Sequence, residues 1–172
     1  SVEKLAPNLI NIFGGKDATV ISGITDYTWM QLLSETGSDL GKWPTEKHFT
    51  SWLGLSPGQH HSGKMRRNAK KKGHPKAGQI FRVISLGLIN SKDIALGAFG
   101  RRLRGRKGPR IAIKAMARKL AVLYWRIMMK GLDYAEKGIQ NYEEQIMLNK
   151  MKTLNRLVKE LNVKMPDNVQ VA

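Results

Sequence analysis

The chain has 172 residues, a net charge of +17 at neutral pH and no cysteine. A chain of this length suits one domain with a short appendage, and it can bury enough surface to fold without disulfides or metals. The lack of cysteine excludes thiol catalysis, thiolate metal sites and a disulfide framework. No signal-peptide pattern is evident, and the apolar runs fall far short of the ~20 residues that span a bilayer. Because the sequence opens on Ser1 without an initiator methionine, we expect a piece of a longer protein.

The positive charge is concentrated in the middle of the chain. From Lys47 to Lys130 there are 21 Lys and Arg residues against one acid, Asp93, whereas the flanks carry 9 basic and 12 acidic residues. A basic centre between near-neutral ends is typical of a protein that binds a polyanion. Nucleic acid is the expected partner; an anionic membrane is the alternative, but no amphipathic Lys- and Trp-rich helix supports it. We therefore expect a cytoplasmic, nucleoid-associated protein with no membrane partner.

Two helices are predicted before residue 40. Apolar residues at helical spacing predict the first over residues 3–13, ended by Gly14-Gly15. The second is expected to begin with Asp26 as its N-cap and to run to about Thr36. Its buried face is expected to comprise Trp29, Met30, Leu32 and Leu33.

The turn Ile21-Ser22-Gly23-Ile24 has the apolar-x-Gly-apolar form of a helix-hairpin-helix element. In that motif backbone N–H groups of the turn contact a DNA phosphate, which would involve Ser22, Gly23 and Thr25 here. Thr25 occupies the position where a second glycine usually follows. A plain helix-packing turn is the alternative interpretation, and both remain open.

Thr45, after the turn at Trp43-Pro44, is a good N-cap for a helix over residues 46–53. Glu46 and His48 are expected on its exposed side. The residues expected to pack inward are Phe49, Trp52 and Leu53.

Residues 55–76 are expected to form a protruding basic loop. They contain three glycines, two prolines, seven Lys or Arg residues and no acid, a composition that interrupts helices and cannot bury itself. Ser62 lies in the middle, next to Gly63, so the loop suits either a serine nucleophile attacking a phosphodiester or a loop that only grips phosphates. The expected DNA contacts here are Gly63, Lys64, Arg66, Arg67, Lys70, Lys71, Lys72 and Lys76.

What would activate Ser62 is not evident from its neighbours in sequence. His60 or His61 acting as a base is one interpretation, and simple phosphate or loop hydrogen bonding is the other. No Asp or Glu occurs between Lys47 and Asp93, and the sequence has no His-x-x-x-His pair. We therefore expect no metal site in this loop.

Three further helices are predicted between residues 75 and 131. Pro75 suits the first turn of a helix that is apolar nearly all round and therefore central to the core; its apolar residues are Ile80, Phe81, Val83, Ile84, Leu86 and Leu88. The next is expected over residues 92–103, with Ala95, Leu96 and Phe99 inside. The third is expected over residues 111–130, with Gly131 closing it; its basic side comprises Lys114, Arg118, Lys119 and Arg126.

A second basic cluster lies between the last two of these helices. Its glycines and proline predict a phosphate-facing turn, with a merely solvated loop as the alternative. The residues expected to bind DNA are Arg101, Arg102, Arg104 and Arg106; Lys107 and Arg110 belong to the same cluster.

The tail has a different character. Met147, Met151, Leu154, Val158 and Leu161 form a heptad-like seam in a helix predicted from about residue 139 to 163. That helix packs on its own domain or pairs with another copy or another domain, and the sequence leaves these open. With no strand pattern, we predict an all-α chain: a compact helical DNA-binding and catalytic domain over residues 1–132 and a long helical tail over 133–172.

The sequence resembles one family of transposases. The residues that carry the resemblance are Ile21-Ser22-Gly23-Ile24, Trp52-Leu53-Gly54-Leu55-Ser56-Pro57, His61-Ser62-Gly63-Lys64, Arg66-Arg67 and Lys72-Gly73, and they fall within residues 18–130. They are similar to the C-terminal domain of the insertion-sequence one-ten family, the bridge-RNA-guided serine recombinases of mobile elements. Lys64 departs from the family pattern, where a second glycine often follows Ser-Gly.

The resemblance implies a serine nucleophile at Ser62, which would cut and rejoin DNA through a transient phosphoserine link. It also implies an N-terminal metal-binding domain, with Mg²⁺, that this sequence lacks, so we expect no cofactor within this chain and no activity from it alone. A guide RNA and a homo-oligomeric parent protein are further implications. The alternative function is a non-catalytic module that binds structured nucleic acid.

Overall fold

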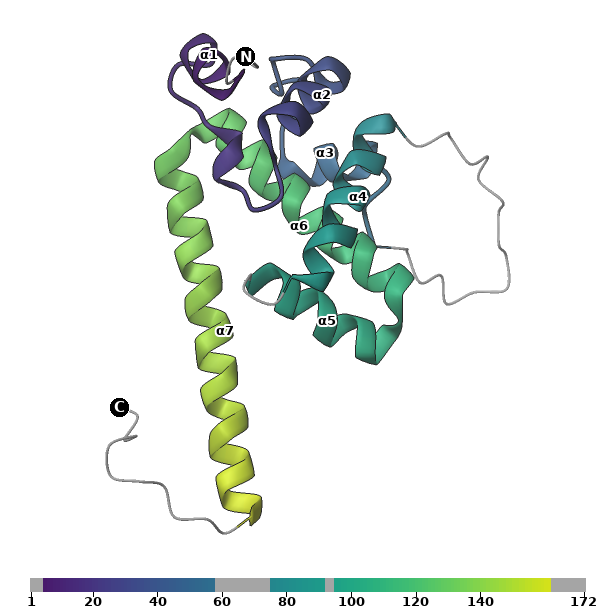
Figure 1. Ribbon diagram of the computed structural model, residues 1–172, viewed down its shortest axis with the longest axis vertical. Helices are drawn as coiled ribbons and strands as arrows, with labels where there is room; N and C mark the ends of the chain where they lie inside the picture. Colours follow the sequence, from purple (N-terminus) through teal and green to yellow (C-terminus); the bar gives the residue numbers. More distant parts are fainter. Residues whose placement is uncertain (1–4, 58–74, 92–94, 162–172) are drawn as a thin grey trace. The chain divides into compact units, whose positions relative to one another are not determined.

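The computed structural model describes residues 5–57, 75–91 and 95–161, and these residues form helices and turns without a strand (Figure 1). The all-α prediction is confirmed. The elements are α1 Leu5–Ile12, the 3-10 helix η1 Ala18–Val20, α2 Asp26–Thr36, α3 Glu46–Trp52, α4 Lys76–Asn90, α5 Ala95–Lys107, α6 Pro109–Lys130 and α7 Leu132–Leu161. The chain divides into two compact units, residues 1–135 and 136–172.

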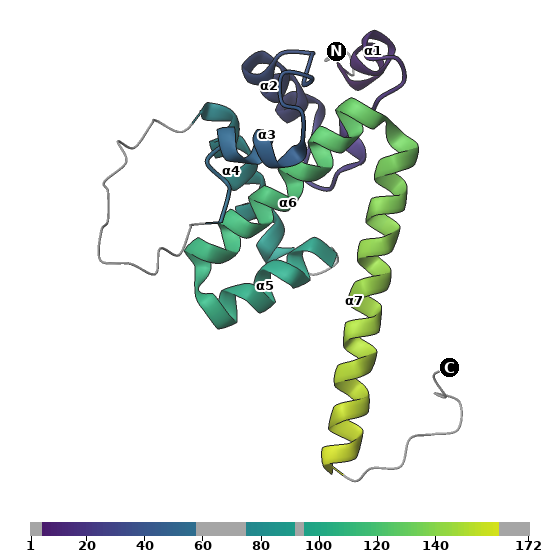
Figure 2. The same ribbon diagram turned by 180° about the vertical axis from the view of Figure 1, so that it is seen from behind.

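The helix at the centre of the first unit is α6. Helices α3, α4 and α5 all pack against it, and Figure 2 shows α3 lying across it. Side chains along the length of α6 are completely enclosed: Ala112, Met116, Ala117, Leu120, Ala121, Tyr124 and Ile127. Gly131 ends α6, as predicted, with φ at +83° and its N–H donating to Ile127 O, a backbone conformation that suits glycine.

The helix after Pro75 packs against three other helices, as predicted for a central helix, but it is not buried on all sides. Helix α4 buries Phe81, Ile84 and Leu88, but Val83 is 69% exposed and Leu86 is 52% exposed. Its partners are α2, α5 and α6, which leave one apolar strip of the helix uncovered. The number of apolar residues around α4 therefore led to an overestimate of how much of this helix is buried.

The start of α2 differs from the prediction by one residue. Thr25, not Asp26, is the N-cap: its hydroxyl accepts from Thr28 N at 3.3 Å, and the Thr28 hydroxyl accepts from Thr25 N at 2.7 Å. This reciprocal pair is a capping box, which satisfies two helix N–H groups. Asp26 stands in the first turn, where a carboxylate favours the positive end of the helix. Met30, predicted as buried, is 43% exposed.

The glycine turn before α2 packs on α4. Gly23 has φ at +88°, and a Cβ added there would lie 2.6 Å from Ile84 Cγ2. Ile21 and Ile24 are both buried, and Ile24 N donates to Ile21 O at 3.0 Å. The helix before the turn is the three-residue η1. A phosphate contact by Ser22, Gly23 and Thr25 stays a prediction.

The second basic cluster is helical rather than a turn. Helix α5 continues through Arg101, Arg102, Arg104 and Arg106 to Lys107, and the connection to α6 is Gly108 alone, with φ at +87°. Arginine is a good helix former, and packing on α6 outweighs the cost of about 1 kcal/mol for the interior glycines. A Cβ at one of them, Gly100, would meet Met116 Sδ in α6, so the glycine allows close contact.

The second unit contains most of α7. Along the predicted seam Met147, Leu154 and Leu161 are exposed, and Met151 and Val158 are half-buried. Arg156 and Glu160, one turn apart, form an ion pair at 3.6 Å.

Candidate nucleic-acid interface

The two ends of the segment 58–74 are joined firmly to the core. Helix α3 leads into the buried residues Leu53 and Leu55, and α4 begins directly after Pro75. A Cβ on Gly78 would lie 2.4 Å from Leu53 O, so only glycine permits this approach of α4 to the end of α3. Arg82 Nη2 adds a hydrogen bond to Gly54 O at 3.2 Å.

Most of the predicted DNA-binding loop lies outside the described residues. The residues outside the described part include Ser62, His60 and His61. They also include the predicted contacts Gly63, Lys64, Arg66, Arg67, Lys70, Lys71 and Lys72. Their roles stay predictions. Of the loop's cations, Lys76 is described, and it is exposed at the start of α4.

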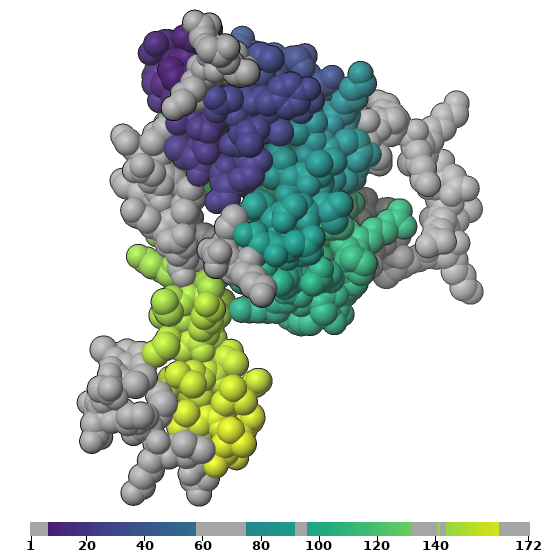
Figure 3. Space-filling model, in the orientation of Figure 1, coloured from purple at the N-terminus to yellow at the C-terminus, as the bar shows by residue number. Residues whose placement is uncertain are grey.

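The four arginines that were predicted to bind DNA from this cluster all lie on α5, in two different environments. Arg102, Arg104 and Arg106 are exposed, followed by exposed Lys107 and Arg110 at the start of α6. Arg101 is half-buried, and its Nη1 donates to the carbonyl oxygens of Ile89 and Ser91. Two of the carbonyls that α4 leaves unpaired at its C-terminus thereby gain a partner. Arg102, Arg104 and Arg106 are therefore accessible to phosphates, whereas Arg101 connects α4 to α5. Figure 3 shows the surfaces of α4 and α5 as one continuous face.

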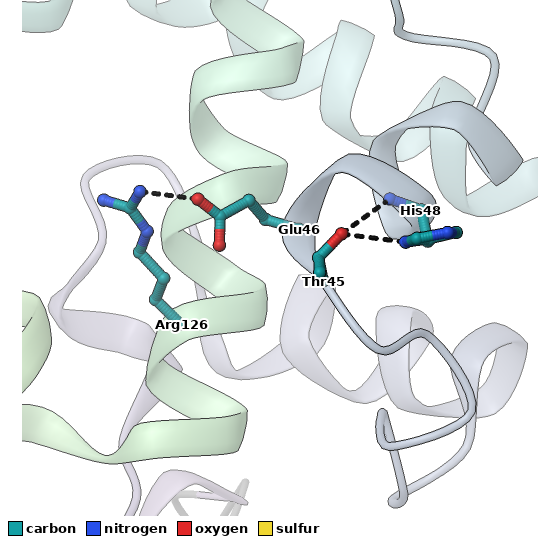
Figure 4. A network of polar contacts seen from close by, with 4 residues as sticks. All are labelled: Thr45, Glu46, His48 and Arg126. Carbon is teal, nitrogen blue, oxygen red and sulfur yellow. Dashed lines mark hydrogen bonds and ion pairs between the residues drawn. The ribbon is translucent and has the colours of Figure 1, made fainter.

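Two cations of α6 have partners inside the unit. Lys119 Nζ lies 4.6 Å from the centroid of the Phe99 ring, and burial lowers the pKa of this amine. Arg126 Nη2 lies 2.7 Å from Glu46 Oε1 at the start of α3 (Figure 4). The guanidinium holds the pKa of Glu46 below its usual value. Sequence reasoning placed Glu46 on an exposed face, since no local pattern connects residues 80 positions apart.

The turn before α3 is anchored to α6 in a second way. Trp125 Nε1 donates to Trp43 O at 3.1 Å in a buried hydrogen bond. Thr45 caps α3 as predicted: its Oγ1 accepts from His48 N at 3.4 Å and lies 2.8 Å from His48 Nδ1 (Figure 4). These contacts hold the turn at Trp43 on α6 and define the start of α3.

The sequence did not predict the aromatic cluster that Trp43, in the turn before α3, forms with Phe49 and Trp52 of α3. The ring of Trp52 lies 4.6 Å from that of Trp43 and 6.3 Å from that of Phe49, centroid to centroid. Trp52 was predicted to pack inward, but it is 37% exposed. Lys42 Nζ lies 4.5 Å from the Trp43 ring centroid. A useful signal in the sequence was the pair of Trp residues beside Lys42 and Lys47, since aromatic and basic residues alternate in many nucleic-acid sites.

Within the described ranges, no group of three or more His, Asp or Glu residues is placed to hold a metal ion. No described helix is long and apolar enough to cross a membrane.

A family model for the transposase IS116/IS110/IS902 family matches residues 18–95. The matched segment begins at η1 and ends at the first residue of α5, so it includes the loop 58–74 and both of its anchors. It is shorter than the range 18–130 over which the sequence showed its resemblance. Neither the curated proteins nor the solved structures compared with the chain gave a match.

Proposed function

We propose that this chain, whose residues 18–95 match a model of the transposase IS116/IS110/IS902 family, belongs to a transposase that cuts and rejoins the DNA of a mobile element with Ser62 as nucleophile. The observation that supports this most is the extent of the match. It includes the segment in which a serine is surrounded by seven Lys and Arg residues and no acid.

In the proposed step the Ser62 hydroxyl loses its proton and its oxygen attacks a DNA phosphorus. An oxygen–phosphorus bond to serine forms, one ester bond of the DNA breaks, and the leaving DNA oxygen takes up a proton. A deoxyribose hydroxyl of another strand then attacks the phosphoserine, which joins the strands and restores the serine. Cations beside Ser62 would stabilise the charge that builds on the phosphate oxygens in each step.

The anchors of the loop support this role. A nucleophile works well only when its position relative to the phosphate is defined. The contact of Gly78 with Leu53 and the hydrogen bond from Arg82 to Gly54 fix the two ends from which the segment 58–74 starts and finishes.

Activation of Ser62 is proposed to come from a Mg²⁺-binding domain outside these residues. The described part of the chain offers no cluster of acidic or histidine residues for such an ion, so none of its residues is assigned as a ligand. A guide RNA and a homo-oligomeric parent protein belong to the same proposal.

DNA is the partner that transposase function requires, and the exposed cations on α4, α5 and α6 are proposed to contact its phosphates. These are Lys76, Arg102, Arg104 and Arg106, with Lys107 and Arg110 beside them. Phosphate contacts fix position and carry little sequence information, so the target sequence would be selected elsewhere.

The experiment that tests the proposal measures strand joining by the parent protein, supplied with Mg²⁺, guide RNA and DNA. Ser62→Ala should abolish the joined product and leave DNA binding unchanged. Ser51→Ala, at an exposed serine of α3, is the matched control and should join DNA normally. Joining by Ser62→Ala at the normal rate would show that Ser62 is not the nucleophile. It would favour the alternative for this chain, a module that only binds nucleic acid while the chemistry occurs elsewhere in the parent protein.

A further inference from the structure

The indole of Trp52 is a partly exposed ring on a rigid support. Its inner side contacts Trp43, which is 8% exposed, and Phe49, which is fully buried. Trp43 is held in turn by the hydrogen bond between its carbonyl and Trp125. The exposed part of the Trp52 ring therefore keeps one orientation at the end of α3.

The surroundings of this ring are polar and positively charged. Lys47, His48 and Ser51 are exposed on α3, and Lys42 lies over the Trp43 ring. The acid of α3, Glu46, is paired with Arg126, so its charge is compensated. An anionic ligand could approach the ring without meeting an uncompensated carboxylate on this helix.

We propose that Trp52 stacks on one unpaired base of a nucleic acid, with Lys42, which lies over the neighbouring Trp43 ring, near an adjoining phosphate. This inference rests on the proposed function in one respect, that the chain acts on nucleic acid. Exchange of strands unpairs bases, and an unpaired base offers a free π-face to an aromatic side chain. A base within a duplex is stacked on both sides and offers none.

The exposure of Trp52 distinguishes it from the other tryptophans of this fold. Trp29 is completely enclosed, and Trp43 and Trp125 are also buried, as expected of rings that serve the core. A docking surface for a protein would need a contiguous apolar patch, whereas the exposed neighbours of Trp52 on α3 are polar. One flat apolar ring in a cluster that also holds Lys42 fits a single base with its phosphate.

The test compares binding of a labelled 12-nucleotide single strand and the corresponding duplex to the 172-residue chain at one salt concentration. Trp52→Leu should weaken single-strand binding about 5- to 100-fold, the loss expected for one aromatic–base stack, and change duplex binding less than about twofold. Trp52→Tyr, which keeps a stacking ring, should restore most of the affinity. The control Tyr27→Leu removes an exposed aromatic ring from α2 and should affect neither ligand.

Tryptophan fluorescence of the unmodified chain gives a second measurement that needs no variant. Single-stranded DNA should quench the emission, and an abasic strand of equal length should not. Equal losses for both ligands in Trp52→Leu, no loss for either, or the same quenching by both strands would each overturn the inference. These binding measurements include no strand-joining step, so failure of the nucleophile proposal would be recognised separately in the joining assay.

Discussion

Arg126 and Glu46 form an ion pair at 2.7 Å between the C-terminal half of α6 and the first turn of α3, although they are 80 residues apart in the sequence. Both side chains are 31% exposed. The pair orients α3 on α6 together with the Trp125–Trp43 hydrogen bond. Helix α3 carries Phe49 and Trp52 of the aromatic cluster, and the chain runs from its end into the segment 58–74.

Glu46→Gln is expected to lower stability by less than about 1 kcal/mol at neutral pH, because partly exposed pairs are screened by solvent. The pKa of Glu46 is lowered in the fold, so its stabilisation is present above the unfolded pKa and is lost as pH falls through the folded value. Denaturant unfolding from pH 7 to pH 3 should show the difference between the variant and the unmodified chain become smaller as the pH falls. A difference that persists unchanged at pH 3 would contradict this role.

Gly78→Ala should destabilise the fold by about 1–3 kcal/mol, as overpacking does, because the added Cβ would meet the Leu53 carbonyl at 2.4 Å. Gly87→Ala is the matched control on the same helix, at a position with open space around it. This control should be neutral or stabilise α4 by up to about 1 kcal/mol. Urea unfolding of both variants checks the prediction, and equal effects would refute the close contact of α4 with the end of α3.

The phenol of Tyr124 should lose its proton at a higher pH than that of an exposed tyrosine. Burial raises the pKa of its phenol to about 12. Between the unfolded value and this one the folded chain binds the extra proton, so stability should fall as pH rises through that interval. An absorbance titration of the phenolate bands should resolve a component that titrates at the highest pH, and Tyr124→Phe should remove it. If that variant instead lost a component that titrates at lower pH, the assignment would be disproved.

Arg101→Ala and Arg106→Ala should have opposite consequences. Loss of Arg101 leaves the carbonyls of Ile89 and Ser91 without this donor, and it should cost about 1–3 kcal/mol of stability. Loss of exposed Arg106 should leave stability within about 0.5 kcal/mol. It should instead reduce the salt dependence of DNA binding, by about one unit of slope if it neutralises one phosphate. Thermal unfolding and a salt titration separate the two, and a reversed pattern would refute the assignments.

Local signals in the sequence predicted much of the fold. Thr45 as an N-cap, Gly131 as a helix end and the apolar periodicity of residues 111–130 all depend on neighbours within a few positions. The length of α5 was misjudged because its glycines were taken as breaks, whereas contact with α6 stabilises the helix across them. The burial of α4 was overestimated because apolar side chains all around a helix do not show which side lacks a partner.

The candidate site was predictable to a smaller extent. The basic composition around Ser62 indicated a phosphate-binding segment, and the family match includes it. The internal role of Arg101, the pairing of Arg126 with Glu46 and the exposure of Trp52 depend on contacts between distant segments. Charge alone could not separate the arginine that holds the fold from those that face solvent.

The most direct test of the central claim is a search for a covalent link between the parent protein and labelled DNA, in the presence of Mg²⁺ and guide RNA. The proposed chemistry predicts an adduct that survives denaturation, disappears in Ser62→Ala and remains in Ser51→Ala. Peptide mapping should locate the DNA on Ser62. An adduct of undiminished yield in Ser62→Ala, or DNA joining by the unmodified protein without any adduct, would contradict the account.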